Sequence, residues 1–175
     1  DKNIKLRSLN PLDSNCIAQT IIDGNNSDSC IKIQNGQNNL TCVAGFTIQD
    51  GNGVFGGGIL VSYSFGPTVM YCLIKDNNAI KPVDQTSGGY GGGIDYRWDS
   101  NGTVHNCIIS DNFASHAGGG IHVGPGSGCR IENNKITNNT TIGEAGGGIY
   151  GYDGTTLWIR KNEITNNNAV NANGG

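Results

Sequence analysis

The sequence is poor in charged residues and has no long apolar run, and both shortages exclude classes of protein. Charged residues make up 14% of the 175 residues, with a net charge of −3, whereas soluble domains carry about a quarter. Lys and Arg are scattered and form no basic stripe, which argues against a nucleic-acid partner. No apolar run approaches the roughly 18 residues that a membrane span needs, so no membrane span is expected.

Proline and leucine are also scarce, and this favours strands over helices. Proline occurs 4 times, and isoleucine outnumbers leucine 20 to 7; β-branched residues are enriched in strands. No segment shows the apolar spacing of an amphipathic helix. Glycine, at 29 residues, is far above its usual share of about 7%. The composition therefore predicts an all-β chain with many turns.

Two series of isoleucines repeat along the chain with the same period. The motif Gly-Gly-Gly-Ile occurs four times, and a second series follows in segments such as FTIQDG and KITNNT. Both series have one long spacing of 35 residues, caused by an insertion at about 80–90, and otherwise spacings of 26 to 28. Such a recurrence predicts stacked repeats. The first series is Ile59, Ile94, Ile121 and Ile149, headed by Ile31; the second is Ile48, Ile74, Ile109, Ile136 and Ile164, headed by Ile21.

The residues around these isoleucines predict a parallel β-helix. A valine and isoleucine column precedes the second series by five residues, at Val43, Val69, Val104, Ile131 and Ile159. Asp, Asn and Gly follow it and suit turns, because they tolerate the left-handed conformation and bond their own backbone. We expect a single domain over residues 1–175, with about six coils of about 27 residues, each strand about 4.8 Å above the last.

The six cysteines have no spacing that supports zinc or a fixed disulfide framework. Cys72 and Cys107 share a column on adjacent coils, and we interpret them as buried thiols, since stacked Cβ atoms are too far apart for a usual disulfide. Cys16 is expected in the inward valine column. One bridge among Cys30, Cys42 and Cys129 is left open.

The segments TIIDGN and GFTIQDGN and the GGGI repeats resemble the right-handed parallel β-helix proteins of the pectate-lyase-like superfamily. They are most similar to large bacterial surface proteins with GG-[GA]-I repeats. The resemblance covers essentially the whole chain and implies the fold. It also implies a secreted or cell-surface location. It does not fix the function, because such folds include polysaccharide lyases, adhesins and purely structural modules.

One outer face carries the candidate site. The first and third residues after the GGGI isoleucine should point outward, which brings Asp95, Arg97 and His122 together with Tyr150 and Tyr152. The insertion, with Lys81, Asp84 and Tyr90, could wall this face. These five residues are candidates for glycan binding. If the protein is an enzyme, Arg97 would neutralise a uronate carboxylate and His122 would take its α-proton, beside Asp95.

The residues of the candidate site also have simpler, structural interpretations. Asp95 and Arg97 could form a surface ion pair, and a tyrosine ladder could only stabilise the sheet. Asp50, Asp76 and Asp111 stack at a turn and are weak candidates for calcium, but Asn replaces them in later coils, which suits turn residues better. No other cofactor is expected.

The end of the chain suggests a longer array. Asn173-Gly174-Gly175 begins another glycine turn with no cap after it, and solenoid ends need caps. The sequence thus predicts a non-catalytic extracellular or surface module that serves as a rigid scaffold or a glycan-facing adhesion segment. The alternatives are a polysaccharide lyase acting on acidic glycans and a subunit that associates end to end in a filament.

Overall fold

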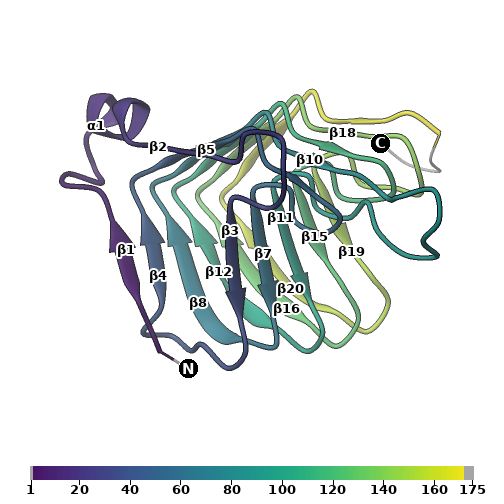
Figure 1. Ribbon diagram of the computed structural model, residues 1–175, viewed down its shortest axis with the longest axis horizontal. Helices are drawn as coiled ribbons and strands as arrows, with labels where there is room; N and C mark the ends of the chain where they lie inside the picture. The colour runs from purple at the N-terminus through teal and green to yellow at the C-terminus, as the bar shows by residue number, and fades with distance from the viewer. Residues whose placement is uncertain (1, 172–175) are drawn as a thin grey trace.

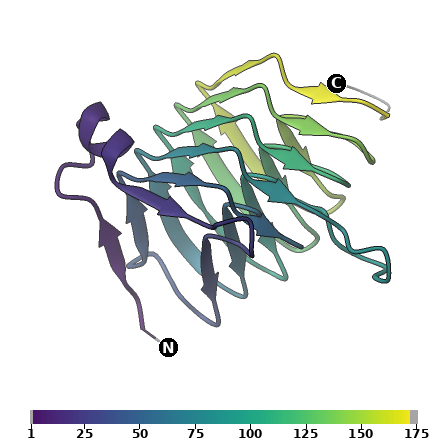
Figure 2. The same ribbon diagram turned by 45° about the horizontal axis from the view of Figure 1, so that its top comes forward.

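A computed structural model describes residues 2–171. The chain forms a right-handed parallel β-helix of about 5 turns, with a period of ~28 residues. Figures 1 and 2 show the coils stacked along one axis, with the insertion before β11 projecting from the stack. The predicted fold class, with about six coils of about 27 residues, is therefore confirmed. The glycine turn expected at Asn173–Gly175 lies outside the described residues, and end-to-end association stays a prediction.

Each complete coil contributes one short strand to each of four parallel sheets, numbered here in the order in which a coil visits them. The first coil has no strand in sheet 3, and the last described coil has none in sheet 4. Sheet 1 consists of β1 (Lys5–Arg7), β4 (Cys42–Ala44), β8 (Phe65–Met70), β12 (Asn101–His105), β16 (Gly128–Glu132) and β20 (Thr156–Arg160). Sheet 2 consists of β2 (Ile21–Asp23), β5 (Thr47–Gln49), β9 (Leu73–Lys75), β13 (Ile108–Ser110), β17 (Lys135–Thr137) and β21 (Glu163–Thr165).

The other two sheets complete the coil. Sheet 3 has two-residue strands: β6 (Asn52–Gly53), β10 (Asn78–Ala79), β14 (Phe113–Ala114), β18 (Thr140–Thr141) and β22 (Asn168–Ala169). Sheet 4 begins at the GGGI isoleucines: β3 (Ile31–Gln34), β7 (Ile59–Ser62), β11 (Ile94–Arg97), β15 (Ile121–Val123) and β19 (Ile149–Gly151). The insertion joins β10 to β11, and it therefore borders sheet 4.

The register of the sheets matches the predicted columns with one exception. Ile31, Ile59, Ile94, Ile121 and Ile149 pair directly from coil to coil. In sheet 2, however, Ile22 rather than Ile21 pairs with Ile48. The predicted head of that column was wrong by one residue, and Ile21 is exposed instead. The inward isoleucines and valines form one continuous core along the axis.

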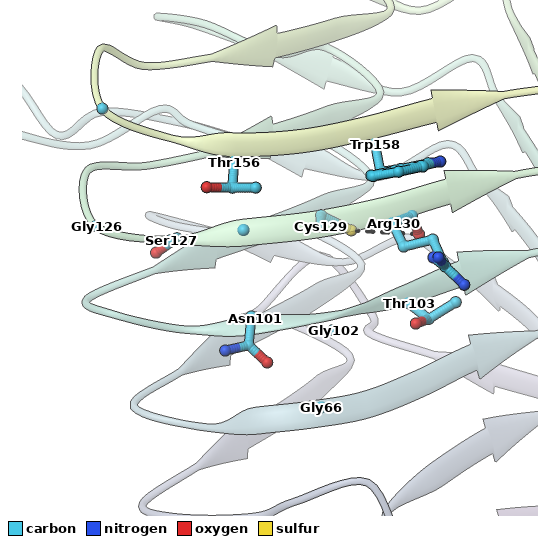
Figure 3. Close-up of a pocket in the computed structure, with 12 residues that line it drawn as sticks. Gly66, Asn101, Gly102, Thr103, Gly126, Ser127, Cys129, Arg130, Thr156 and Trp158 are labelled. Carbon is cyan, nitrogen blue, oxygen red and sulfur yellow. Dashed lines mark hydrogen bonds between the residues drawn. The ribbon is translucent and has the colours of Figure 1, made fainter.

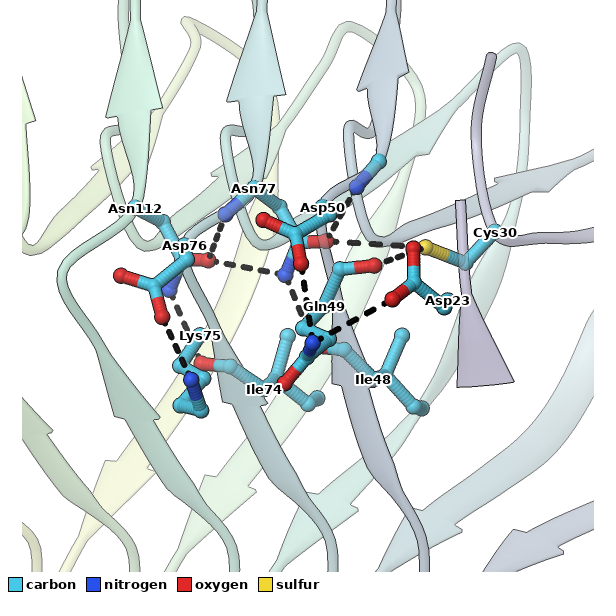
Figure 4. Close-up of polar contacts among 11 residues, drawn as sticks. Asp23, Cys30, Ile48, Gln49, Asp50, Ile74, Lys75, Asp76, Asn77 and Asn112 are labelled. Atoms are coloured by element: carbon cyan, nitrogen blue, oxygen red, sulfur yellow. Dashed lines mark hydrogen bonds and ion pairs between the residues drawn. The ribbon is translucent and has the colours of Figure 1, made fainter. Parts of the chain in front are cut away.

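A ladder of buried asparagines crosses the corner between sheets 2 and 3 (Figure 4). Asn112 donates from Nδ2 to Ile74 O at 3.0 Å and to Asn139 Oδ1 at 2.9 Å, while its own Oδ1 accepts from the Asn77 backbone and side chain. The aspartates that precede these residues are in the left-handed conformation, with φ of 54–57°. The turn prediction is confirmed, but the side-chain bonds of Asn112 run to neighbouring coils rather than to its own backbone.

Asn112→Ala should lower the free energy of unfolding by about 2–3 kcal/mol, because it leaves buried donors and acceptors without partners. Urea denaturation of the purified chain measures this loss. Asn168→Ala is the matched control: Asn168 is exposed on β22, and its change should stay within about 0.5 kcal/mol. Equal losses in both variants would contradict the stabilising role of the ladder.

The N-terminal coil departs from the predicted pattern in one helix. Helix α1 (Ser14–Gln19) begins after Asp13, whose side chain accepts a hydrogen bond from Asn15 N. Cys16 lies in this helix and is only half-buried, so its predicted place in the valine column was wrong. The helix has six residues, fewer than two turns, too short to show an amphipathic period.

All six cysteines are free thiols, so the bridge left open among Cys30, Cys42 and Cys129 is not formed. Cys72 and Cys107 are buried, as predicted. Burial raises the pKa of Cys30 to about 11 and that of Cys129 to about 12. These two thiols therefore have little thiolate character at neutral pH.

Candidate functional site

Sheet 4 brings three of the predicted site residues into direct contact. Asp95 and Arg97 are successive outward residues of β11, and His122 is the register partner of Asp95 on β15. The Asp95 Oδ1 atom lies 2.6 Å from His122 Nδ1, and the Asp95 Oδ2 atom lies 2.9 Å from Arg97 Nε. The carboxylate thus sits between an imidazole and a guanidinium, as the spacing of the repeats predicts.

These three side chains are buried, although they point away from the core. Asp95 is 0% exposed, His122 is 1% and Arg97 is 7%. The interpretation of Asp95 and Arg97 as a surface ion pair was therefore wrong. Burial lowers the pKa of Arg97, and the neighbouring Asp95 opposes this shift.

Aromatic rings cover the charged cluster. The Arg97 guanidinium carbon lies 3.5 Å from the centre of the Phe55 ring, 4.6 Å from that of Trp98 and 5.3 Å from that of Tyr90. His122 packs between Tyr90 at 4.6 Å and Tyr150 at 5.7 Å, parallel to the second ring. Such rings attract a cation through their faces. They also exclude water, which strengthens the ion contacts beneath them.

Three polar atoms of the cluster lack a well-formed hydrogen bond within residues 2–171. They are Asp95 Oδ2, Arg97 Nε and His122 Nε2. The first two are close, at 2.9 Å, but the Nε–H is not aimed at the oxygen, so their contact is ionic only. Buried polar groups are nearly always satisfied in native proteins. The cluster therefore has hydrogen-bonding capacity that a ligand or water can use.

A cavity of about 290 Å³ opens beside the cluster. Arg97 and His122 line it together with Tyr90, Trp98, Tyr152 and Ser87. Two residues of the insertion, Ser87 and Tyr90, thus form part of its wall, as predicted for this segment. Lys81 and Asp84 do not line the cavity. Tyr152 borders both this cavity and an open one of about 700 Å³, which Tyr150 also lines.

Phe55 and Trp98 were missed in the sequence, although the register contained a signal for both. Ser62 pairs with Arg97, so the next residues, Tyr63 and Trp98, must lie one above the other. Their rings stack at 5.5 Å with an interplanar angle of 11°. Phe55 and Tyr90 precede the GGGI motifs by one residue and stack at 6.3 Å. We call Phe55, Tyr63, Tyr90, Trp98 and Tyr152 the aromatic face.

Asp50 and Asp76, two of the three aspartates considered for calcium, lie at the corner after sheet 2 (Figure 4), and Asp111 has the same place in the next coil, directly after β13. Asp50 Oδ2 accepts a hydrogen bond from Gln49 at 2.8 Å, and Asp76 Oδ2 pairs with Lys75 at 2.6 Å. Calcium takes six to eight oxygen ligands, and residues 2–171 contain no cluster of three or more His, Cys, Asp or Glu side chains that could hold a metal ion. The geometry favours the turn interpretation of Asp50, Asp76 and Asp111.

A second groove lies on sheet 1 (Figure 3). It has a volume of about 410 Å³ and a glycine-rich floor. Trp158 is 57% exposed there, and Arg130 lies over its ring at 5.6 Å. The neighbouring ion pairs between coils, Arg160 with Glu132 and Lys135 with Glu163, are present at 3.4 and 3.1 Å.

A family model described as "Periplasmic copper-binding protein (NosD)" matches residues 63–172, more than half of the chain. The chain belongs to this family. Membership agrees with the predicted β-helix repeats and with a location outside the cytoplasm, in the periplasm or at the surface. No curated protein and no solved structure matches. Among the described residues, no helix is long and apolar enough to cross a membrane.

Proposed function

We propose that this NosD-family chain is a non-catalytic β-helix module, a rigid scaffold that binds a glycan with its aromatic face. The observation that carries the proposal is the row of partly exposed rings on one side of sheet 4. Trp98 is 40% exposed and stacks on Tyr63, and Tyr152, which is 44% exposed, lines the same cavity as Trp98. Flat rings with one free face suit the apolar faces of sugar rings, while their edges and the nearby polar groups set orientation.

The state of Asp95 and Arg97 supports a non-catalytic role. The two charges contact each other at 2.9 Å beneath the rings. Arg97 is therefore already compensated and is not a free cation for a substrate carboxylate. Catalysis needs groups whose interactions strengthen in the transition state, whereas this pair is engaged within the folded chain.

Glycan binding is tested by titration calorimetry with a panel of neutral and acidic oligosaccharides. Trp98→Ala should weaken binding at least about tenfold, which corresponds to about 1.4 kcal/mol, and Tyr63→Ala should weaken it in the same direction. The matched control is Trp158→Ala, because Trp158 is an exposed tryptophan on sheet 1. Absence of binding to every oligosaccharide would refute the proposal, as would equal losses in Trp98→Ala and Trp158→Ala.

Copper binding is not part of the proposal, because the donor groups do not fit that metal. Copper sites in proteins use Cys, Met and His ligands. Residues 2–171 gather no cluster of three or more His, Cys, Asp or Glu groups. His122, whose Nε2 atom has no partner, has the Arg97 guanidinium beside it, and a cation repels a second cation.

A polysaccharide lyase is the second candidate, and one contact favours it. Asp95 holds His122 at Nδ1, at 2.6 Å, and leaves Nε2 without a partner, an arrangement that suits a general base. An ultraviolet assay for unsaturated product with acidic polysaccharides tests this function. Product formation that is lost in His122→Ala would replace the non-catalytic proposal.

A further inference from the structure

We propose that the cavity beside Trp98 holds one neutral sugar residue, whose adjacent hydroxyls bond to His122 Nε2 and to the Arg97 guanidinium. The inference rests on the proposed glycan-binding function and adds to it the binding position and the chemical class of the bound unit. Three observations carry it: the size of the cavity, the hydrogen-bonding groups inside it and its charge.

The cavity is the right size for a single ring. Its volume of about 290 Å³ lies just below the range of about 300–1,000 Å³ for small-molecule sites, as suits a single ring. Tyr90, Trp98 and Tyr152 supply aromatic walls, and Ser87 lies at the insertion side. Small-molecule sites are usually lined by aromatic and apolar side chains, with a few polar groups that orient the ligand.

His122 offers a hydrogen-bond acceptor to the ligand. A carboxylate only accepts hydrogen bonds, so the contact between Asp95 Oδ1 and His122 Nδ1 assigns the ring proton to Nδ1. In the neutral ring, Nε2 then has a lone pair; this atom is buried and has no partner among the described residues. A sugar hydroxyl can donate to it, and this bond would satisfy a buried group that is otherwise costly.

Arg97 offers the complementary donor, and the charge balance favours a neutral sugar. Arg97 is the one Arg or Lys among the residues that line the cavity, and Asp95 already compensates it at 2.9 Å. A uronate would bring a second carboxylate toward Asp95 with no further cation to stabilise it, and burying an unpaired charge is unfavourable. Two neighbouring hydroxyls instead supply one donor for His122 and one acceptor for Arg97.

The experiment compares two trisaccharides of the same linkage, one of galactose and one of galacturonate, by titration calorimetry on the intact chain. The neutral trisaccharide should bind at least about tenfold more tightly. Ser87→Trp, which puts a large ring at a residue that lines the cavity, should weaken its binding at least about tenfold. Thr86→Trp is the control, because Thr86 is exposed in the same insertion and does not line the cavity, and its affinity should equal that of the wild type.

The outcomes separate this inference from the proposed function. If the galacturonate binds as tightly as the neutral sugar, or if Ser87→Trp binds normally while Trp98→Ala does not, the cavity assignment is wrong and the glycan-binding face remains. If neither trisaccharide nor any other glycan of the panel binds, both the cavity assignment and the proposed glycan-binding function are wrong. His122→Leu should also lower the affinity. If that variant does not fold, as judged by its circular dichroism, Ser87→Trp decides the question.

Discussion

Gly92→Val should prevent the β-helix from reaching its native fold, or lower the free energy of unfolding by more than about 4 kcal/mol. A Cβ atom at Gly92 would lie 2.4 Å from Gly119 O and 2.5 Å from Phe113 O, both backbone atoms of the next coil. Gly92 N in turn bonds Gly118 O at 3.1 Å. Because these backbone atoms belong to paired strands and turns, they cannot move aside without breaking the stack.

Gly36→Ala is the control for Gly92→Val, because it measures the cost of replacing a glycine at a position where no neighbouring atom is close. Gly36 has a φ of +90°, but nothing lies within 4 Å of its Cβ position. Its substitution should cost about 1–2 kcal/mol, the penalty of a left-handed conformation alone. Thermal and urea denaturation of both variants give the comparison. If both variants lose a similar free energy of unfolding, the close contact between Gly92 and the next coil is not what excludes a side chain at that position.

The stacking of the coils could be predicted from the sequence because it depends on repeated local patterns. The glycine triplets, the isoleucine columns and the Asp or Asn residues at the corners recur from coil to coil, so the register follows from their spacing. The prediction failed where a residue is not repeated. Ile21 was chosen over Ile22, and helix α1 interrupts the pattern in the first coil with only six residues.

The site could be predicted in part, for the same reason. Register alone brings Asp95, Arg97 and His122 together, because alternate residues of adjacent strands share a face. Their burial could not be predicted, because it depends on rings that come from outside the strands. Tyr90 reaches the cluster from the insertion, and Trp98 adopts a left-handed conformation, with φ of 53°, just after β11. The register gives the positions of both residues within their coils, but it does not predict that their rings fold over Asp95, Arg97 and His122.

Asp95→Ala should lower the free energy of unfolding by about 3–5 kcal/mol, the cost of leaving one partner of a buried ion pair without its counter-charge. Arg97 would then be a buried cation held only by aromatic faces, and His122 Nδ1 would lose its acceptor. Urea denaturation measures the loss. Lys135→Ala is the control: its ion pair with Glu163 is exposed on both sides, and such pairs contribute less than about 1 kcal/mol.

The double variant Asp95→Leu with Arg97→Met distinguishes loss of the pair from loss of packing. Apolar residues of similar volume often replace a buried ion pair without a net loss of stability, so this variant should recover most of what Asp95→Ala loses. If Asp95→Ala instead costs no more than Lys135→Ala, Arg97 must be reaching water when its partner is removed. The rings of Phe55, Tyr90 and Trp98 would then be a mobile cover rather than a fixed one, and the case for a catalytic cluster beneath them would become stronger.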